Sequence, residues 1–493
     1  MAAQVEEQQQ PKDLEEGKPP SGRGWREGAA RWAVLLAVTG LVASVAAQEF
    51  TVQQHYNAFG NLAAIREDAA AANQTIPYKD LAIFVTKWAL PPYVASLVAL
   101  VAVLPILWII EIKGVRVVVL ALGLAASAGV LLKVAANFLD LSNLTIHTGQ
   151  TLINLSRFAL LPVSHRLCVA WFGPKCISLI CSVVFFCDTV TCQLIFYSLN
   201  YLPFPKFGIL LGFMTPHLML WTYDNNFSQF TTHIVYPFLF MSMLPIAFSL
   251  GAFFINGEPK EAPSAAEKMR RNLEKPDRSF VGFVKRLHAL FAGDTNLLMN
   301  AIGFGIAYGI VMMMFHPIRL TVLFKIHEHS EDLDLPVSVV IAACGCLGAV
   351  VSGLVLDYTR RHQLLGQCSY SGLFAFHIAL VISVYSRSEF FIFFSYGSVR
   401  SFFFSAYVPA ALEYAAERSY PGLESSTSGV MLATGYLVAG VFTACFGTHF
   451  ADHNDATLTG YIASALLLVG LVFSAGIEES FLRRHRADRQ NSD

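Results

Sequence analysis

The chain has 493 residues, of which 55% are hydrophobic, 13% aromatic and only 14% charged, and its mean hydropathy is +0.51. Soluble domains usually carry about 25% charged residues, so this composition predicts a polytopic integral membrane protein embedded in a lipid bilayer. The formal net charge of −1 lacks the basic surplus of proteins that bind nucleic acid, so we expect no nucleic-acid partner.

The first residues of the chain are polar and lack the short apolar core and small-residue cleavage site of a signal peptide. We therefore expect residues 1–30 to form a disordered cytoplasmic N-terminus. The nine cysteines lie mostly in apolar runs, which favours small buried side chains over disulfides or a metal cluster.

A helix needs roughly 20 apolar residues to cross a bilayer, and the sequence predicts such segments in chain order. They lie at 31–58, 82–110, 115–138, 147–171, 176–200, 232–255, 296–322, 335–356, 367–386, 389–415, 425–449 and 457–479. A further apolar segment, 206–222, is short and broken by Pro216. We expect this segment to dip into the outer surface or to lie on it.

Lysine and arginine mark the cytoplasmic side of membrane proteins, and here they gather in the longest connection and in the C-terminal tail. Both termini are therefore expected in the cytoplasm. The predicted parts are an N-terminal six-helix half (31–255), a cytoplasmic linker (256–294), a C-terminal six-helix half (295–480) and a cytoplasmic tail (481–493).

Three glycosylation sequons fall in connections that this topology places outside, at Asn73, Asn143 and Asn226. They predict a glycoprotein of the secretory route, with the plasma membrane as its destination. A fourth sequon at Asn154 lies within a predicted span and is attributed to chance.

The connections after the second and eighth spans each place an acid at a helix end with basic residues close behind. These are Glu111 with Lys113 and Arg116, and Asp357 with Arg360 and Arg361. The repeat resembles the inner-loop signature of the major facilitator superfamily, whose acid–base pairs latch the two halves together. Small residues in the eighth span, Gly345, Gly348 and Gly353, suit close helix packing in lipid. The expected fold is therefore all-α, with twelve transmembrane helices in two six-helix halves and a substrate site near the midplane.

A narrower resemblance rests on four stretches: EYAAERSYPGLESSTSGVMLATG (413–435), RLCVAWFGPKCISLICSV (166–183), VIAACGCLGAVVSGLVLDYTRR (340–361) and HTGQTLINLSRF (147–158). Together they resemble the feline leukaemia virus subgroup C receptor-related transporters, which are associated with heme, choline and ethanolamine. The resemblance retains Glu413 and Glu417, which share a helix face. We expect these two carboxylates to pair with inner-loop bases during gating.

The resemblance also implies a central cavity lined by aromatic side chains and glutamines. Gln48 and Gln150 match the family's glutamines, and Phe304 and Tyr308 lie where the family keeps aromatic residues. Elsewhere the chain departs from the pattern: Glu49 replaces a tryptophan, Arg157 and Tyr436 each replace a glutamine, and Asp188 replaces an asparagine.

These departures suggest a charged, hydrated site. Glu49 and Arg157 are expected to face one cavity, either paired or each meeting part of the substrate; the alternative places Glu49 in headgroup water. An arginine suits an anionic group such as the heme propionates, because guanidinium pairs bidentately with carboxylate. Asp188 is expected either to bind a proton or cation, or to bond a neighbouring hydroxyl.

Three histidines could in principle bind a metal or heme, but each also has a commoner structural role. His327 and His329 flank Glu328 in an outer connection and favour a solvated loop over a metal site. His316, before Pro317, favours a hydrogen-bonded membrane histidine over a heme ligand.

The sequence therefore predicts a monomeric carrier that works by alternating access on a small-molecule substrate. Heme or a related amphipathic metabolite is the first choice of substrate, and choline or ethanolamine is the alternative. A third possibility, from a different functional class, is a receptor or sensor that has the same fold but does not transport its ligand. Neither an enzymatic motif nor a cofactor or metal requirement is evident.

Overall fold

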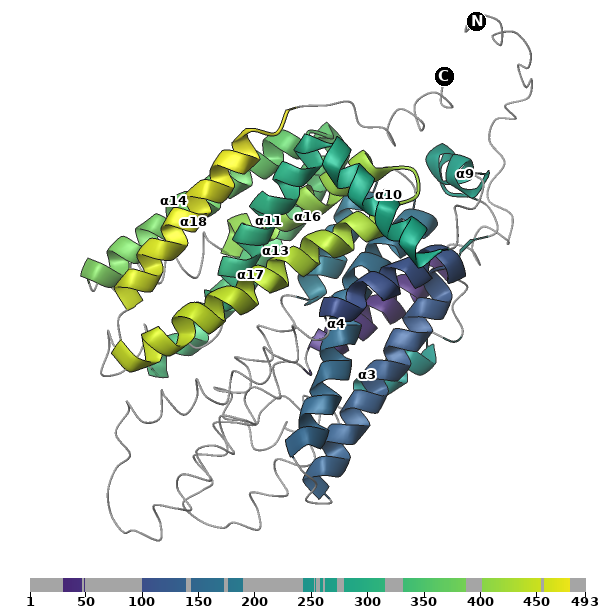
Figure 1. Cartoon of the computed structure of the whole chain (residues 1–493), viewed down its shortest axis with the longest axis horizontal. Coiled ribbons are helices and arrows are strands. Elements are labelled where there is room, and N and C mark those ends of the chain that lie inside the picture. The colour runs from purple at the N-terminus through teal and green to yellow at the C-terminus, as the bar shows by residue number, and fades with distance from the viewer. Residues whose placement is uncertain are drawn as a thin grey trace, which may run out of the picture.

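The computed structural model describes residues 30–46, 48, 100–138, 143–172, 176–188, 243–251, 253, 258–259, 262–272, 279–314, 331–386, 401–453 and 456–478. All regular secondary structure in these ranges is helical, which confirms the all-α class. The labelled helices are α3 (Val115–Phe138), α4 (Asn143–Trp171), α9 (Ala265–Asn272), α10 (Phe280–Gly293), α11 (Thr295–Met314), α13 (Glu331–Thr359), α14 (His362–Ser386), α16 (Ser401–Ser419), α17 (Glu424–His453) and α18 (Ala456–Ala475) (Figure 1). Shorter apolar helices cover Ala30–Ala46 and Ile177–Asp188, and further helical segments cover residues 100–113 and 243–251.

The predicted spans agree with these helices where the described residues test them. Within those residues, four helical windows are long and apolar enough to cross a membrane: Val115–Ala135, Thr295–Met312, His362–Ser383 and Glu424–Phe442. Helix α3 has the predicted bounds, whereas α4 begins four residues before the predicted 147, at Asn143. The insert 206–222 and parts of several other predicted spans lie outside the described residues, so the count of twelve stays a prediction.

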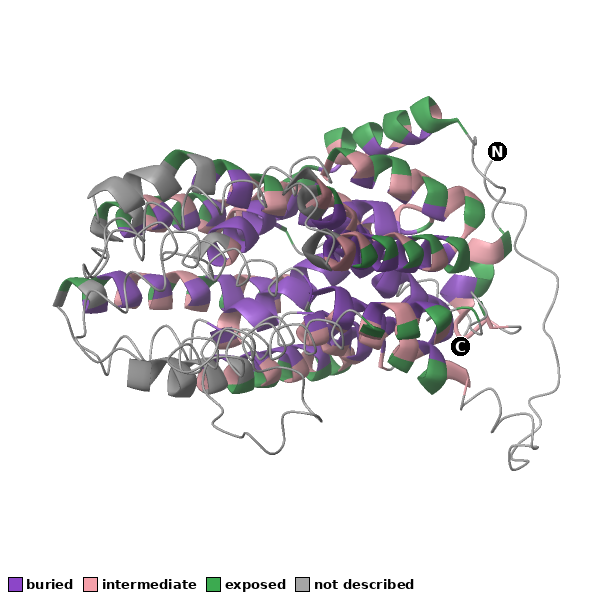
Figure 2. Cartoon of the chain, turned by 90° about the horizontal axis from the view of Figure 1, so that it is seen from below, coloured by how far each residue is buried: buried purple, intermediate pink, exposed green. Residues whose placement is uncertain are grey.

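Helix α3 shows why the chain needs a lipid environment. Val117, Leu124 and Leu131 are each about half exposed, and their spacing of seven places them on one face of the helix. Val118 and Leu122, on another face, are buried. Figure 2 shows the same pattern around the bundle, with buried residues between the helices and exposed residues on the outside. An apolar outer face of this kind is stable against lipid tails rather than water.

Two glycines bring α3 and α4 into close contact. A Cβ atom on Gly149 would lie 2.5 Å from the carbonyl oxygen of Gly129 and 2.9 Å from Cγ of Lys133. Only glycine permits backbones this close, which is how small residues drive helix association in membranes.

The C-terminal half is packed in the same way. A Cβ atom on Gly348 of α13 would overlap the backbone of Phe402 in α16, and Gly345 faces Ser401 and Ser405. The predicted role of these glycines in close helix packing is therefore confirmed. In Figure 1 the helices of residues 30–188 lie beside those of residues 295–475, and α17 packs against α4 across the boundary.

The predicted linker contains two helices at one end of the bundle, here called the linker end. Ser264 caps α9 by accepting a hydrogen bond from the backbone N–H of Glu267 at 3.1 Å. Helix α10 begins after Ser279 and packs Phe280 edge-on against Trp108, with ring centroids 5.6 Å apart. Both linker helices therefore contact the transmembrane bundle.

Candidate substrate site and inter-half contacts

Three polar side chains follow one face of α4, four and then three residues apart. Gln150, Asn154 and Arg157 are all buried. The Gln150 amide donates to Oδ1 of Asn154 at 2.7 Å. The burial of Asn154 in this network agrees with the expectation that its sequon is a chance match.

Lys133 of α3 joins this polar face, and sequence reasoning overlooked it. Its ammonium donates to Oε1 of Gln150 at 3.2 Å and to the backbone carbonyl of Gln48 at 3.3 Å. Gln48 is itself buried, at the end of the first described helix. Among the described residues, both of these acceptors are neutral. A lysine inside an apolar run is the signal that marks such a residue, because a charge in the membrane interior is costly and usually functional.

Arg157 pairs with Asp188 across the N-terminal half. Its Nε and Nη2 atoms lie 3.2 Å from Oδ1 and Oδ2 of Asp188, and both side chains are buried. Glu49 lies outside the described residues, so its expected place in one cavity with Arg157, paired or each meeting part of the substrate, stays a prediction. The ion pair is a contact of Asp188 that the sequence did not predict, and its expected roles in binding a proton or cation or a neighbouring hydroxyl stay predictions.

An aromatic cluster from both halves lies where the sequence placed ring contacts. Phe304 and Tyr308 of α11 stack with centroids 5.4 Å apart, and the Tyr308 hydroxyl donates to that of Tyr436 in α17 at 3.1 Å. Phe158 of α4 completes the cluster, 4.0 Å from the Tyr436 ring. Since Arg157 directly precedes Phe158 in α4, the structure brings the predicted Tyr436 and Tyr308 close to the helix turn that carries Arg157, at one boundary between the halves.

At the linker end, Glu111 contacts the opposite half. It accepts a hydrogen bond from the Ser426 hydroxyl at 2.6 Å, in the first turn of α17, and lies 3.6 Å from Arg286 of α10. The guanidinium of Arg116 donates to the backbone carbonyl of Phe253 at 3.0 Å; its role in gating stays a prediction. The first acid–base motif therefore joins the halves through a serine at a helix N-terminus.

Asp357 makes the corresponding contact from the other half. Its two carboxylate oxygens accept the backbone N–H groups of Ser178 and Leu179, each at 3.0 Å. These are orphan donors at the start of helix 177–188, where the helix dipole favours a negative charge. Each half thus extends a carboxylate to a helix N-terminus of its partner half.

The basic residues of the two acid–base motifs lie at the surface or at a helix end. Lys113 and Arg361 are exposed, and Arg360 occupies a left-handed backbone conformation with φ of 57°. The backbone N–H of Arg360 bonds the carbonyl of Leu356 at 2.8 Å, which ends α13. The role of Lys113, Arg360 and Arg361 in gating stays a prediction.

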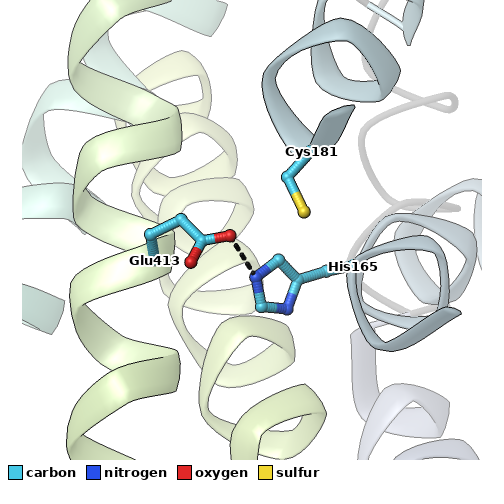
Figure 3. A group of neighbouring side chains, drawn as sticks. All are labelled: His165, Cys181 and Glu413. Carbon is cyan, nitrogen blue, oxygen red and sulfur yellow. Dashed lines mark hydrogen bonds and ion pairs between the residues drawn. The ribbon is translucent and has the colours of Figure 1, made fainter. Parts of the chain in front are cut away.

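The two retained glutamates of α16 are fully buried. A hydrogen bond of 2.9 Å joins Oε1 of Glu413 to Nε2 of His165 in α4 (Figure 3). The partner of Glu413 in this conformation is thus a histidine of the opposite half, and the expected pairing of both glutamates with inner-loop bases during gating stays a prediction. Glu417 lies one turn further along α16, close to the linker end.

A larger ion cluster ties α9 to the bundle, and sequence reasoning missed it. Arg166 of α4 forms a bidentate pair with Glu267 of α9, with N–O distances of 2.9 and 2.8 Å, and both are buried. Arg270 and Arg271 lie 3.7 and 3.3 Å from the same carboxylate. The C-terminal half joins through the Tyr420 hydroxyl, which donates to the carbonyl of Ala266. Helix α9 therefore contacts both halves.

Other sequence-predicted positions are less informative. Asn143 is the first residue of α4, and its glycosylation stays a prediction. Glu49, Asn73, Asn226, His316 and the 327–329 histidine pair lie outside the described residues.

The close α3–α4 contact gives a stability prediction. Gly149→Ala would press a methyl group on the Gly129 backbone and the Lys133 stem, and overpacking of this kind costs about 1–3 kcal/mol. We expect a lower thermal midpoint for the purified protein in detergent. Gly366→Ala is the matched control, because a Cβ there meets nothing within 4 Å and should be neutral or mildly stabilising. Equal midpoints for the two variants would contradict the packing.

Glu111 gives a pH prediction. It lies just beyond the predicted span, and burial raises its pKa from 4.5 to about 7, against the opposing effects of Ser426 and Arg286. A carboxyl with a raised pKa takes up a proton more readily in that conformation, so acid favours the closed contact. As pH falls from about 7 to about 4.5, we expect the linker ends of the two halves to approach.

Energy transfer between dyes at the exposed positions Lys113 and Arg361 measures this approach. Glu111→Gln should abolish the pH dependence in that window. A dependence unchanged in this variant would show that another group titrates.

Comparisons with known proteins agree with this geometry. No protein-family profile matches the chain. An uncharacterised transporter of major-facilitator type from Caenorhabditis elegans is 25% identical over 393 residues, covering 78% of this chain and 61% of the relative. A choline/ethanolamine transporter of Danio rerio is 23% identical over 423 residues, which cover 85% of this chain and 83% of the relative. A human choline/ethanolamine transporter is 22% identical over 409 residues, which cover 83% of this chain and 72% of the relative.

Solved structures show the same fold at low identity. A proton:xylose symporter matches with a TM-score of 0.63 and 11% identity, covering 94% of this chain and 99% of that one. The fucose:proton symporter of E. coli matches with a TM-score of 0.62 and 10% identity, covering 91% and 98%.

The fold is that of transporters of the major facilitator superfamily, and the curated relatives are membrane transporters, so the chain is a membrane transporter with this fold. Among curated proteins the chain is similar to choline/ethanolamine transporters of the feline leukaemia virus subgroup C receptor-related group, which supports the resemblance drawn from the sequence motifs. It is a multi-pass integral membrane protein.

Proposed function

We propose that the chain carries an amphipathic metabolite with an anionic group, of which heme is the leading example, by alternating access. The observation that carries this proposal is the charge balance of the described polar face. Arg157 is compensated by Asp188, whereas Lys133 donates to the neutral oxygens of Gln48 and Gln150. A buried cation with neutral acceptors favours an anionic ligand group, because charge-assisted hydrogen bonds are the stronger ones.

The aromatic cluster supplies the complementary apolar contact. The rings of Phe158, Tyr308 and Tyr436 come from three helices of both halves. A flat aromatic ligand body packs favourably on such rings, so one end of the ligand would meet Lys133 and the other the cluster.

Alternating access is supported by the contacts at the linker end. Glu111 with Ser426 and Asp357 with helix 177–188 hold the halves together there. Exchange of the substrate would require these contacts to part, so the described conformation corresponds to a carrier closed on that side. We infer that this side faces the cytoplasm, that the protein acts as a monomer and that it resides in the plasma membrane.

The test is uptake of labelled heme and labelled choline into vesicles containing the purified protein. Lys133→Gln should lower heme uptake about ten- to a hundredfold, which corresponds to the loss of about 1.5–3 kcal/mol from one hydrogen bond to a charged group. Lys113→Gln is the matched control, since that lysine is exposed at the linker end and should leave uptake unchanged. Heme uptake that is insensitive to Lys133→Gln would contradict the proposed role.

Choline or ethanolamine is the second candidate, favoured by the names of the relatives and by the same rings. A quaternary ammonium is held by aromatic faces, and Tyr436 presents its ring between Phe158 and Tyr308. Choline uptake that falls in Tyr436→Ala, with heme inert, would establish this substrate and overturn the first.

A further inference from the structure

Three possible metal ligands from three helices converge near the linker end, away from the proposed substrate site. They are His165 of α4, Cys181 of helix 177–188 and Glu413 of α16 (Figure 3). The imidazole Nε2 lies 2.9 Å from Oε1 of Glu413, and all three ligand atoms lie within 4.8 Å of one another. Each of the three side chains is buried.

This spacing is close to that of a real metal site. Zinc binds nitrogen, sulfur and oxygen at about 2.0–2.3 Å, so its ligand atoms are separated by about 3–4 Å. The observed atoms need only small shifts to share one ion.

We propose that His165, Cys181 and Glu413 bind a divalent transition metal of the zinc class. Thiolate and imidazole ligands select zinc and its neighbours over magnesium and calcium, which prefer oxygen. Binding displaces the Cys181 thiol proton to solvent, because sulfur coordinates as thiolate. The ion takes the place of the His165–Glu413 hydrogen bond.

The consequence concerns both halves of the carrier. His165 and Cys181 belong to the N-terminal half and Glu413 to the C-terminal half. One ion coordinated by all of them ties α16 to α4 at the linker end. The metal therefore holds that end closed and arrests alternating access, and it enters when the halves part and expose the ligands.

Cobalt titration of the purified protein tests the site without reference to any substrate. Cobalt replaces zinc in such sites and gives a sulfur-to-metal charge-transfer band when a thiolate binds it. We expect one equivalent to produce this band in the wild type and in Cys445→Ser, whose cysteine is exposed. Cys181→Ser and His165→Gln should lose the band or bind at least tenfold more weakly.

Two further measurements use only the wild-type protein and therefore do not depend on whether a variant folds. Zinc should raise the thermal midpoint of the wild type, since a ligand that binds only the folded state stabilises it. X-ray absorption of the zinc-loaded protein should show zinc–sulfur scattering. A zinc shell of nitrogen and oxygen alone, or a cobalt band that persists in Cys181→Ser, would overturn the proposal. Neither measurement depends on whether the protein transports heme or choline, so the metal site can fail without the proposed function failing.

Discussion

Asp188→Asn is expected to produce the largest loss of stability of any single substitution described here. The change leaves the guanidinium of Arg157 buried with no carboxylate at 3.2 Å. Breaking a buried pair by removing one partner costs about 3–5 kcal/mol, since the other charge stays buried and uncompensated. We expect most of the variant to be lost as misfolded protein, measured as the monodisperse fraction after extraction in detergent.

The double variant Arg157→Gln, Asp188→Asn is the control. It removes both charges together, and replacing a whole buried pair is often nearly neutral. Recovery of most of the folded protein is therefore expected. A single variant as stable as the wild type would show that the pair is not formed in the bilayer.

Glu267→Gln is expected to release the linker helix from the bundle. Its carboxylate is the partner of buried Arg166 and lies near Arg270 and Arg271. Loss of about 3 kcal/mol would raise the open population of α9 by about two orders of magnitude. Trypsin cleavage after Lys268 or Arg270 should accelerate accordingly under conditions where opening limits cleavage.

Glu258→Gln is the matched control for the linker. Glu258 approaches Arg166 and Arg271 at 3.9 and 3.8 Å, but its side chain is 47% exposed. Exposed pairs contribute about 0–1 kcal/mol, so cleavage should change little. Equal rates for Glu258→Gln and Glu267→Gln would contradict a clamp centred on Glu267.

The sequence predicted the helices well where one local pattern decides them. Helix α3 has the bounds of its apolar run, and the glycines of α13 lie at a close helix contact as expected. Local hydropathy and small-residue spacing are sufficient for these two features, because each is written in a short stretch of sequence. Tyr308 and Tyr436 come instead from the family resemblance, and the hydrogen bond between their hydroxyls joins two helices.

The partners of the charged residues were harder to predict. Glu111 and Ser426 are hydrogen-bonded although they lie 315 positions apart in the sequence, and Arg166 and Glu267 lie 101 positions apart. Pairing at such separations depends on how whole helices pack, which no local pattern records. The sequence therefore located the acids at the helix ends but assigned the nearest bases to them. Lys133 and His165 were missed because each is a single polar residue whose role comes from neighbouring helices.

Counterflow is the measurement that tests the central claim most directly. Vesicles containing the purified wild type are loaded with unlabelled heme, and entry of labelled heme is followed; a parallel set uses choline. Alternating access predicts that internal solute accelerates entry of the labelled solute several-fold over empty vesicles, for one of the two compounds. Saturable binding of either compound without accelerated entry would contradict a carrier and would identify a receptor on the transporter fold.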